Sequence, residues 1–290
     1  MIKPIRFLLK HPLNRRSKIK ALSRFVRWQL ASRLIGRPIA LPFVEGTSLL
    51  TETGMTGATG NWYCGLHEQD EMGFVLHALR PEDLFVDVGA NIGSYTVLAA
   101  GGVGARVIAF EPHPGTFDKL EANIAFNRLM PRVTAHCCGL SNEPGELAFS
   151  ADADTMNHVM QASETGPSIT VPVRSLDEAL NGEVPVVLKV DVEGHEIPVI
   201  QGAKGTLSNS RLKAVLMETN GSGERYGFSD DDIIEHMAGF GFEACSYDAI
   251  VRSLTKHQPG SDNTIFVRDP DEMQKRCSAA RTYMLINGTI

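Results

Sequence analysis

Short apolar runs alternate with segments of helical periodicity from residue 83 onward, and this alternation constrains the fold more than any other feature. The runs expected to form buried strands are 84–86, 106–110, 133–137, 186–190 and 214–217. Helices are expected between them, at 94–100, 115–127 and 195–207. Strands that alternate with helices indicate βαβ units, because parallel neighbours need a crossover connection. The sequence therefore predicts an α/β fold, with a mostly parallel, doubly wound sheet and helices on both faces.

The segments beyond these strands complete the expected domain. Residues 142–174 contain two strand-like runs and are predicted to form a small inserted hairpin near the ligand cleft. Ser229 is expected to cap a helix, because its hydroxyl can accept a hydrogen bond from the first turn. Two further strands, near Phe242 and at 264–267, would close the far edge of the sheet. We expect one catalytic domain over residues 61–290.

Charge is distributed unevenly along the chain. Residues 1–44 hold eleven Lys and Arg and no acid, so the net charge of −6 leaves −17 for residues 45–290. An acidic body argues against nucleic-acid binding, because neutralising phosphates needs a basic face. Residues 15–35 show apolar positions at helical spacing with basic residues between them, which predicts a basic amphipathic helix. Residues 46–60 are rich in Gly and Thr and are predicted as a loop, so residues 1–60 form an arm and linker.

The basic arm has two interpretations that the sequence leaves open. Its apolar stripe can pack against the body or against a second copy in a homo-oligomer. Alternatively, residues 1–37 attach the protein to an anionic membrane surface, with Trp28 as an interfacial anchor. A membrane span needs a run of about 18 apolar residues, and the sequence has none. The five cysteines show neither disulfide nor zinc spacing, so we expect a cytoplasmic protein, at most peripheral to the inner face of the membrane.

Residues 87–93, read D-V-G-A-N-I-G, follow the first expected strand and precede a helix. Ligands of open α/β sheets bind at such turns, and Glu111 ends the next strand, where a carboxylate can hold ribose hydroxyls. A dinucleotide site favours G-x-G-x-x-G, whose second glycine admits the diphosphate. Asn91 occupies that position here, and Asp87 adds a negative charge. The turn therefore suits the ammonium and sulfonium groups of S-adenosylmethionine, and an NAD-dependent oxidoreductase is the main alternative.

Three motifs together resemble the FkbM family of S-adenosylmethionine-dependent methyltransferases. They are the turn at 85–93, the stretch 109–112 (A-F-E-P) and the stretch 189–196 (K-V-D-V-E-G-H-E). The resemblance covers about residues 70–268. It implies a Rossmann-like class I methyltransferase fold of about seven strands, the last one antiparallel. It also implies O-methylation of a hydroxyl on a sugar, glycan or natural-product acceptor.

The resemblance also assigns residues to the cofactor. Asp87, Gly89, Asn91 and Gly93 would hold the methionine end, Glu111 with its neighbour Pro112 would lie at the ribose, and Ser141 would lie near the adenine.

Polar residues gather where the fourth and fifth expected strands end, and they are the candidates for catalysis. They are Lys189, Asp191, Glu193 and His195 after the fourth strand, and Glu218 and Asn220 after the fifth. In one mechanism, Glu193 or His195 takes the acceptor proton and Lys189 orients a carboxylate. In the other, Asp191 with Glu218 or Asn220 holds Mg²⁺ that polarises the acceptor oxygen. This cluster argues against a third class, a non-catalytic membrane-docking module.

Overall fold

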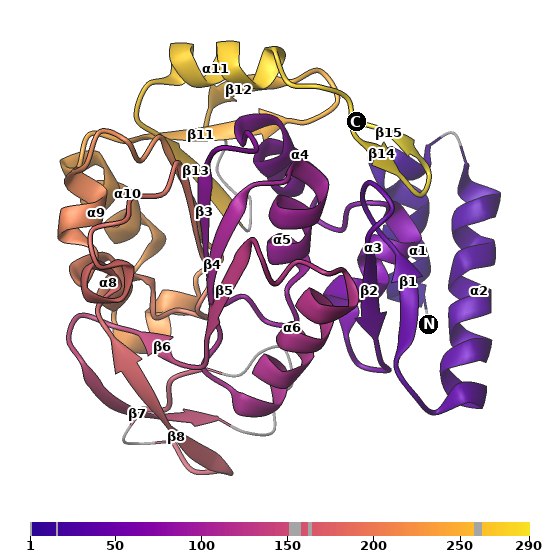
Figure 1. The fold of residues 1–290 in the computed structure, drawn as a ribbon, viewed down its shortest axis with the longest axis horizontal. Helices are drawn as coiled ribbons and strands as arrows, with labels where there is room; N and C mark the ends of the chain where they lie inside the picture. Colours follow the sequence, from indigo (N-terminus) through magenta and orange to yellow (C-terminus); the bar gives the residue numbers. More distant parts are fainter. Residues whose placement is uncertain (1, 16, 151–157, 162–163, 258–262) are drawn as a thin grey trace.

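The fold is described from a computed structural model, which covers residues 2–15, 17–150, 158–161, 164–257 and 263–290 (Figure 1). Among these residues, eight strands form the central sheet, in the order β12-β11-β13-β10-β9-β3-β4-β5. Their bounds are β3 (Leu84–Val88), β4 (Arg106–Phe110), β5 (Val133–His136), β9 (Val187–Val190), β10 (Ala214–Glu218), β11 (Glu243–Asp248), β12 (Ser253–Lys256) and β13 (Asn263–Val267).

The sheet is parallel from β5 to β10 and antiparallel beyond. β3 pairs with β4 on one side and with β9 on the other, so the chain reverses its winding direction at β3. The carboxyl ends of β3 and β9 therefore lie side by side, where such sheets bind ligands. The mostly parallel, doubly wound sheet is confirmed, and so is the antiparallel strand, β13, next to β10. The sequence missed the edge strand, β12, which lies beyond β11.

Successive residues of the strands face opposite sides of the sheet, and each side packs against its own helices. One layer holds α4 (Gln69–Ala78), α5 (Ser94–Val97), the π-helix η2 (Leu98–Val103), α6 (Pro114–Phe126) and α11 (Pro270–Ser278). The other holds α7 (Leu176–Leu180), α8 (Glu196–Gln201), α9 (Lys204–Ser208) and α10 (Asp230–Gly239). Phe85 faces the first layer and Val86 the second, and both are fully buried. Both faces of the sheet are thus apolar, as the continuous apolar runs predicted.

Two local predictions meet different outcomes on the second layer. Ser229 caps α10 with a reciprocal capping box to Asp232, which confirms the predicted helix start. The single helix expected at 195–207 is instead two short helices, α8 and α9. They separate at Gly202, where a Cβ atom would lie 2.1 Å from the carbonyl oxygen of Ser141. The break thus coincides with a close approach between distant parts of the chain.

Smaller sheets surround the central one. The excursion forms β6 (Gly139–Leu140), β7 (Gly145–Ser150) and β8 (Ser168–Arg174), in which β7 and β8 pair antiparallel. The two strand-like runs expected in this segment are confirmed as β7 and β8. The 3₁₀ segment η4 (Ser222–Tyr226) follows β10, and β14 (Met284–Leu285) pairs with β15 (Gly288–Thr289) at the chain end.

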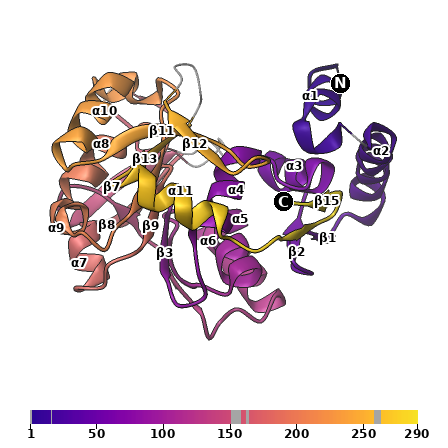
Figure 2. The same ribbon diagram turned by 90° about the horizontal axis from the view of Figure 1, so that it is seen from above.

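The N-terminal region lies at one end of the molecule, as Figure 2 shows. Its elements are α1 (Ile2–Lys10), the 3₁₀ turn η1 (Pro12–Asn14), α2 (Lys18–Ile35), β1 (Ile39–Pro42), β2 (Ser48–Thr51) and α3 (Thr56–Cys64). The helix predicted at 15–35 is confirmed as α2. Arg24 of α2 is buried and donates hydrogen bonds to the carbonyl of Tyr63 and to Oδ1 of Asn14, at 2.7 and 3.2 Å. Trp28 is only 5% exposed, so its expected place as an interfacial anchor is wrong.

The loop predicted at residues 46–60 is also wrong, because β2 and the start of α3 occupy it. β2 pairs antiparallel with β1, and two asparagine side chains at the C-terminal end of α6 bond to its backbone. Oδ1 of Asn123 accepts from the Leu50 amide at 2.7 Å, and Oδ1 of Asn127 accepts from the Ser48 amide at 2.9 Å. These partners lie more than seventy residues away in the chain. Local composition could not reveal them.

Candidate active site

A cavity of about 270 Å³ opens at the carboxyl ends of the parallel strands. Its walls come from the turn after β3, the end of β4, the loops after β9 and β10, the β7–β8 hairpin and the segment 56–68. A second cavity of about 110 Å³ shares Gly89, Asn91 and Asp191 with the first and reaches Lys189. The two cavities therefore form one continuous site across β3 and β9.

The turn after β3 depends on backbone conformations that favour glycine. Gly89 has φ +75°, and a Cβ atom there would lie 1.8 Å from the carbonyl oxygen of Asp191. The amides of Gly89 and Ala90 both donate to the carbonyl of Phe110, at 3.0 and 2.9 Å. The turn is thus fixed to β4 and packed directly against the chain that leaves β9. Gly93 closes it with φ +92°.

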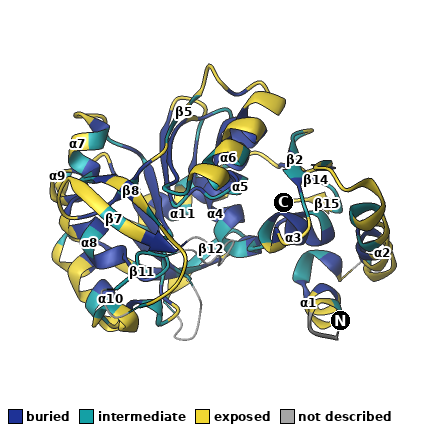
Figure 3. Ribbon diagram, turned by 90° about the horizontal axis from the view of Figure 1, so that it is seen from below, coloured by how far each residue is buried: buried dark blue, intermediate teal, exposed yellow. Residues whose placement is uncertain are grey.

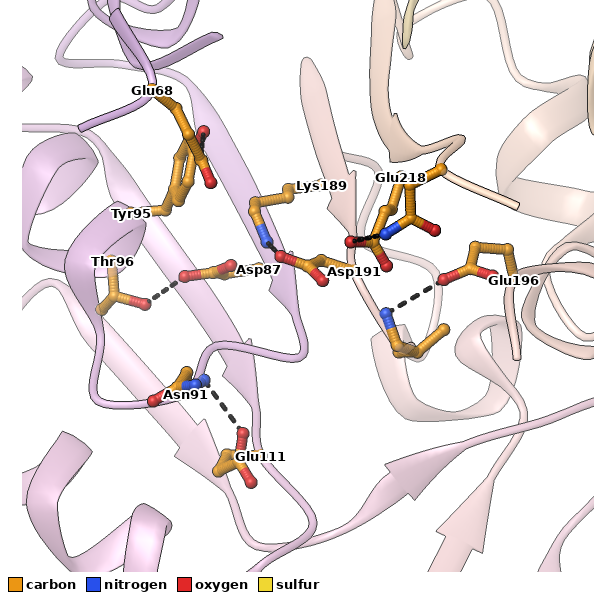
Figure 4. A network of polar contacts seen from close by, with 12 residues as sticks. Glu68, Asp87, Asn91, Tyr95, Thr96, Glu111, Lys189, Asp191, Glu196 and Glu218 are labelled. Carbon is orange, nitrogen blue, oxygen red and sulfur yellow. Dashed lines mark hydrogen bonds and ion pairs between the residues drawn. The ribbon is translucent and has the colours of Figure 1, made fainter. Parts of the chain in front are cut away.

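Glu111 links this turn to the next one (Figure 4). Its Oε2 accepts from the amide of Asn91 and its Oε1 from the amide of His113, both at 2.9 Å. The side chain is 7% exposed, and burial raises the pKa of Glu111 to about 7. Each oxygen keeps a further lone pair, so the carboxylate can still accept hydrogen bonds from hydroxyls in the cavity. Pro112 lies on the wall beside it.

A buried ionic group lies beneath the turn. Nζ of Lys189 donates to Oδ2 of Asp191 at 2.7 Å and lies 4.9 Å from the centre of the Tyr95 ring. Asp87 is fully buried and accepts from the Thr96 hydroxyl at 2.7 Å. Burial raises the pKa of Asp87 and the Lys189 ammonium opposes that rise. Although burial alone would lower it, the carboxylates of Asp191 and Asp87 raise the pKa of Lys189. Asp87 lines neither cavity and lies behind the wall that the turn forms.

Asp191 also belongs to a group of three carboxylates at the ends of β9 and β10. Asp191, Glu193 and Glu218 each place an oxygen within 4.8 Å of the others. Burial, followed by the charges of Asp191 and Glu193, raises the pKa of Glu218 to about 9. Burial and the charge of Asp191 also raise the pKa of Glu193. Glu193 has φ +54°, so the loop itself turns its side chain into the cavity wall.

Asn220 is held beside Glu218 at the end of β10. Its Nδ2 donates to Oε1 of Glu218 at 2.7 Å, and its Oδ1 accepts from the Ser222 amide at 2.9 Å. The amide oxygen is thus used by the backbone. Glu193 joins Asp191 and Glu218 in a group of three carboxylates, and Asn220 lies against Glu218.

His195 and Ser141 lie together at the edge of the site. Nε2 of His195 is 3.1 Å from Oγ of Ser141, and both side chains are buried. Burial lowers the pKa of His195 to about 4, so the imidazole is neutral at pH 7. Ser141 stands next to Cys138, Gly139 and Leu140, which line the cavity past β5.

Sequence reasoning missed two parts of the site. Glu196 shapes the loop after β9, because its Oε1 accepts from the amides of Val192 and Gly194, both at 3.2 Å. The wall formed by Thr56, Gly57, His67 and Glu68 comes from the N-terminal region. Oε2 of Glu68 accepts a hydrogen bond from the Tyr95 hydroxyl at 2.5 Å. The charged run at 189–196 was a signal that could have pointed to Glu196. No motif in the sequence marks the wall that contains Glu68.

A family model described as the methyltransferase FkbM domain matches residues 87–247, which is more than half of the chain. This chain belongs to the FkbM methyltransferase family. The match contains the β3 turn, Glu111 and the loop after β9, so the resemblance inferred from the motifs is confirmed. Membership of this family implies S-adenosylmethionine as the methyl donor.

The FkbM-family relatives differ in their acceptors. The chain is 37% identical over 145 residues to the hexuronic acid methyltransferase AglP of Haloferax volcanii. This alignment covers 49% of this chain and 59% of AglP. It is 27% identical over 222 residues to the 31-O-demethyl-FK506 methyltransferase FkbM of Streptomyces tacrolimicus, covering 64% and 83%. A crystal structure of methyltransferase FkbM from Methylobacillus flagellatus KT aligns with a TM-score of 0.47 at 17% identity, covering 84% and 60%. The chain thus spans about three fifths of AglP.

Proposed function

We propose that this protein is an S-adenosylmethionine-dependent O-methyltransferase. Its acceptor is a hydroxyl group on an uncharged sugar, glycan or natural product. The observation that carries this proposal is the meeting of two features in one cavity. The bare backbone at Gly89 and the carboxylate of Glu111 lie on one wall, and the acidic group of Asp191, Glu193 and Glu218 lies on another. The family assignment supports the methyl-transfer chemistry.

The residues of the first wall fit S-adenosylmethionine. Glu111 has lone pairs free for two ribose hydroxyls, and the carboxylates beside Gly89 suit a cationic ligand. No Lys or Arg among the described residues of the β3 turn is placed to receive a diphosphate. When bound, the cofactor supplies a methyl group activated by a positively charged sulfur. The chain's own residues must then aim the acceptor and remove its proton.

Glu193 is the best-placed general base. No hydrogen bond or ion pair of its carboxylate is found among the described residues, and it lines the cavity. Its raised pKa brings it closer to working pH, where proton transfer is most effective. Glu193 would accept the hydroxyl proton while the acceptor oxygen forms its bond to the methyl carbon and the carbon–sulfur bond breaks. Lys189 holds Asp191 in place beside it.

The charge of the walls favours a neutral acceptor. Five carboxyl side chains line the two cavities, of which Glu218, with a pKa of about 9, is protonated at pH 7. Lys189 is the single Lys or Arg found there among the described residues, and it is already paired. We therefore expect methylation of a glucoside such as p-nitrophenyl glucoside at a rate at least about tenfold above that of the matching glucuronide, because the added carboxylate meets like charge. Assays with labelled cofactor on this pair measure the difference. Preferential methylation of the glucuronide would contradict the proposal.

Cofactor binding should depend on pH through Glu111. Two amides donate to its carboxylate, so the ionised form is the better acceptor for ribose hydroxyls. With a pKa of about 7, its ionised fraction falls as pH falls, and the affinity for S-adenosylhomocysteine should drop about tenfold from pH 8 to pH 6. Glu111→Gln should weaken binding by about 1–3 kcal/mol and flatten this profile. Calorimetry measures both. Affinity for NAD without affinity for S-adenosylhomocysteine would overturn the cofactor assignment.

Asp191, Glu193 and Glu218 lie close enough together to hold Mg²⁺, which would supply a positive charge beside the acceptor oxygen in a second mechanism. If this mechanism operates, EDTA removes activity, Mg²⁺ restores it, and Glu218→Gln loses Mn²⁺ binding measured by electron paramagnetic resonance. If Glu193 is the base, activity is indifferent to EDTA.

A further inference from the structure

The outward side of α2 carries an apolar stripe. Its members recur at spacings of three or four residues and so share one side of the helix: Ile19, Leu22, Val26, Leu30 and Leu34. Their exposed fractions run from 39% at Leu22 to 86% at Ile19. Ala21, Phe25 and Trp28 lie on the opposite side and are buried. The helix therefore has two apolar sides, and only one is used for packing within the described chain.

The position of α2 leaves this stripe accessible. The helix is the outermost element at its end of the molecule in Figures 1 and 2, with α1 and α3 on its inner side. Exposed positions along it are yellow in Figure 3. An exposed stripe of this length on a helix usually marks an interaction surface, because isolated exposed apolar residues do not gather in rows.

Charge identifies the kind of partner. Lys18, Lys20, Arg27 and Arg33 are exposed along α2, and the helix contains no acidic residue. None of these four forms an ion pair with another described residue. A contact between two copies of α2 about a two-fold axis would bring like charges together with nothing to neutralise them. Anionic headgroups neutralise the basic residues while the acyl boundary receives the apolar stripe.

We propose that α2 is a membrane-docking helix that lies in the plane of an anionic bilayer surface, with its apolar stripe inserted between headgroups. The helix has 18 residues and is about 27 Å long. Within the described chain no helix is both long and apolar enough to cross a bilayer, so the contact is a surface contact. The inference rests on α2 alone and stands apart from the proposed reaction.

Flotation of the full-length protein tests this surface. The protein should float with vesicles of mixed phosphatidylcholine and phosphatidylglycerol at low salt, but not with phosphatidylcholine alone, and salt should release it. The triple variant Leu22→Ser, Val26→Ser, Leu30→Ser should lower binding by on the order of a hundredfold while the protein stays folded, because these side chains are 39–59% exposed and lie outside the core. Lys20→Ala and Arg27→Ala should each lower it about fivefold.

A matched control removes apolar surface elsewhere. Met130 and Val251 are 69% and 67% exposed on the body, and Met130→Ser with Val251→Ser should bind vesicles like the wild type. Absence of flotation at low salt would overturn the proposal, as would equal losses in the α2 variant and the control. A wild-type dimer in light scattering that the triple variant converts to a monomer would assign the stripe to a second copy instead.

Discussion

Replacing Glu193 by Gln should lower turnover by roughly a hundredfold or more while the affinity for S-adenosylhomocysteine stays within about twofold. The amide keeps the size of the side chain but cannot accept a proton from the acceptor hydroxyl. Cofactor affinity should survive because Glu111 and the β3 turn remain intact on the other wall. Single-turnover kinetics and calorimetry measure the two quantities separately.

The pH profile distinguishes a base from a merely structural carboxylate. A protonated Glu193 cannot accept the hydroxyl proton, so the wild-type rate should fall as pH falls through its pKa. Because burial and Asp191 raise that pKa, the inflection should lie above the ordinary glutamate value of about 4.3. The Glu193→Gln variant should lack this inflection. Glu224 is exposed, and Glu224→Gln should leave rate and profile unchanged. An unaltered rate in Glu193→Gln would remove Glu193 from the mechanism.

Gly89→Ala should have the largest effect on the cofactor site. An alanine there has a positive φ, which costs about 1–2 kcal/mol, and its Cβ would in addition lie 1.8 Å from a backbone carbonyl oxygen. Either the β3 turn or the loop after β9 must move. We expect loss of measurable binding of S-adenosylhomocysteine and a fall in the free energy of unfolding of about 3 kcal/mol or more.

Gly46→Ala is the matched control for this prediction. Gly46 has φ +80°, close to the +75° of Gly89, but no atom lies within 4 Å of its added Cβ. It should therefore lose only about 1–2 kcal/mol of stability and bind the cofactor normally. Chemical denaturation and calorimetry compare the two variants. Equal losses in both would show that the close approach to Asp191 carries no weight.

The sequence by itself determined the architecture of the body. Apolar runs such as 107–110 are buried on both faces in the structure, so their period and length were enough to place parallel strands. The β3 turn was readable because its glycines and the strand before it are adjacent in the chain. Glu111 followed from the same logic one strand later. These features depend on local backbone conformation, which neighbouring residues set.

Only the tertiary structure decided the rest. Asn123 and Asn127, at the end of α6, bond to the backbone of β2, and Gly202 between α8 and α9 packs against the carbonyl oxygen of Ser141. Glu68, on the cavity wall, accepts a hydrogen bond from Tyr95, which is 27 residues away in the chain.

The two sides of α2 show the same limit. Both carry apolar residues at helical spacing, and only the burial of Phe25 and Trp28 reveals which side packs inward. Hydrophobic periodicity reports that a helix has an apolar face, but the choice of the face that meets the body depends on partners distant in sequence.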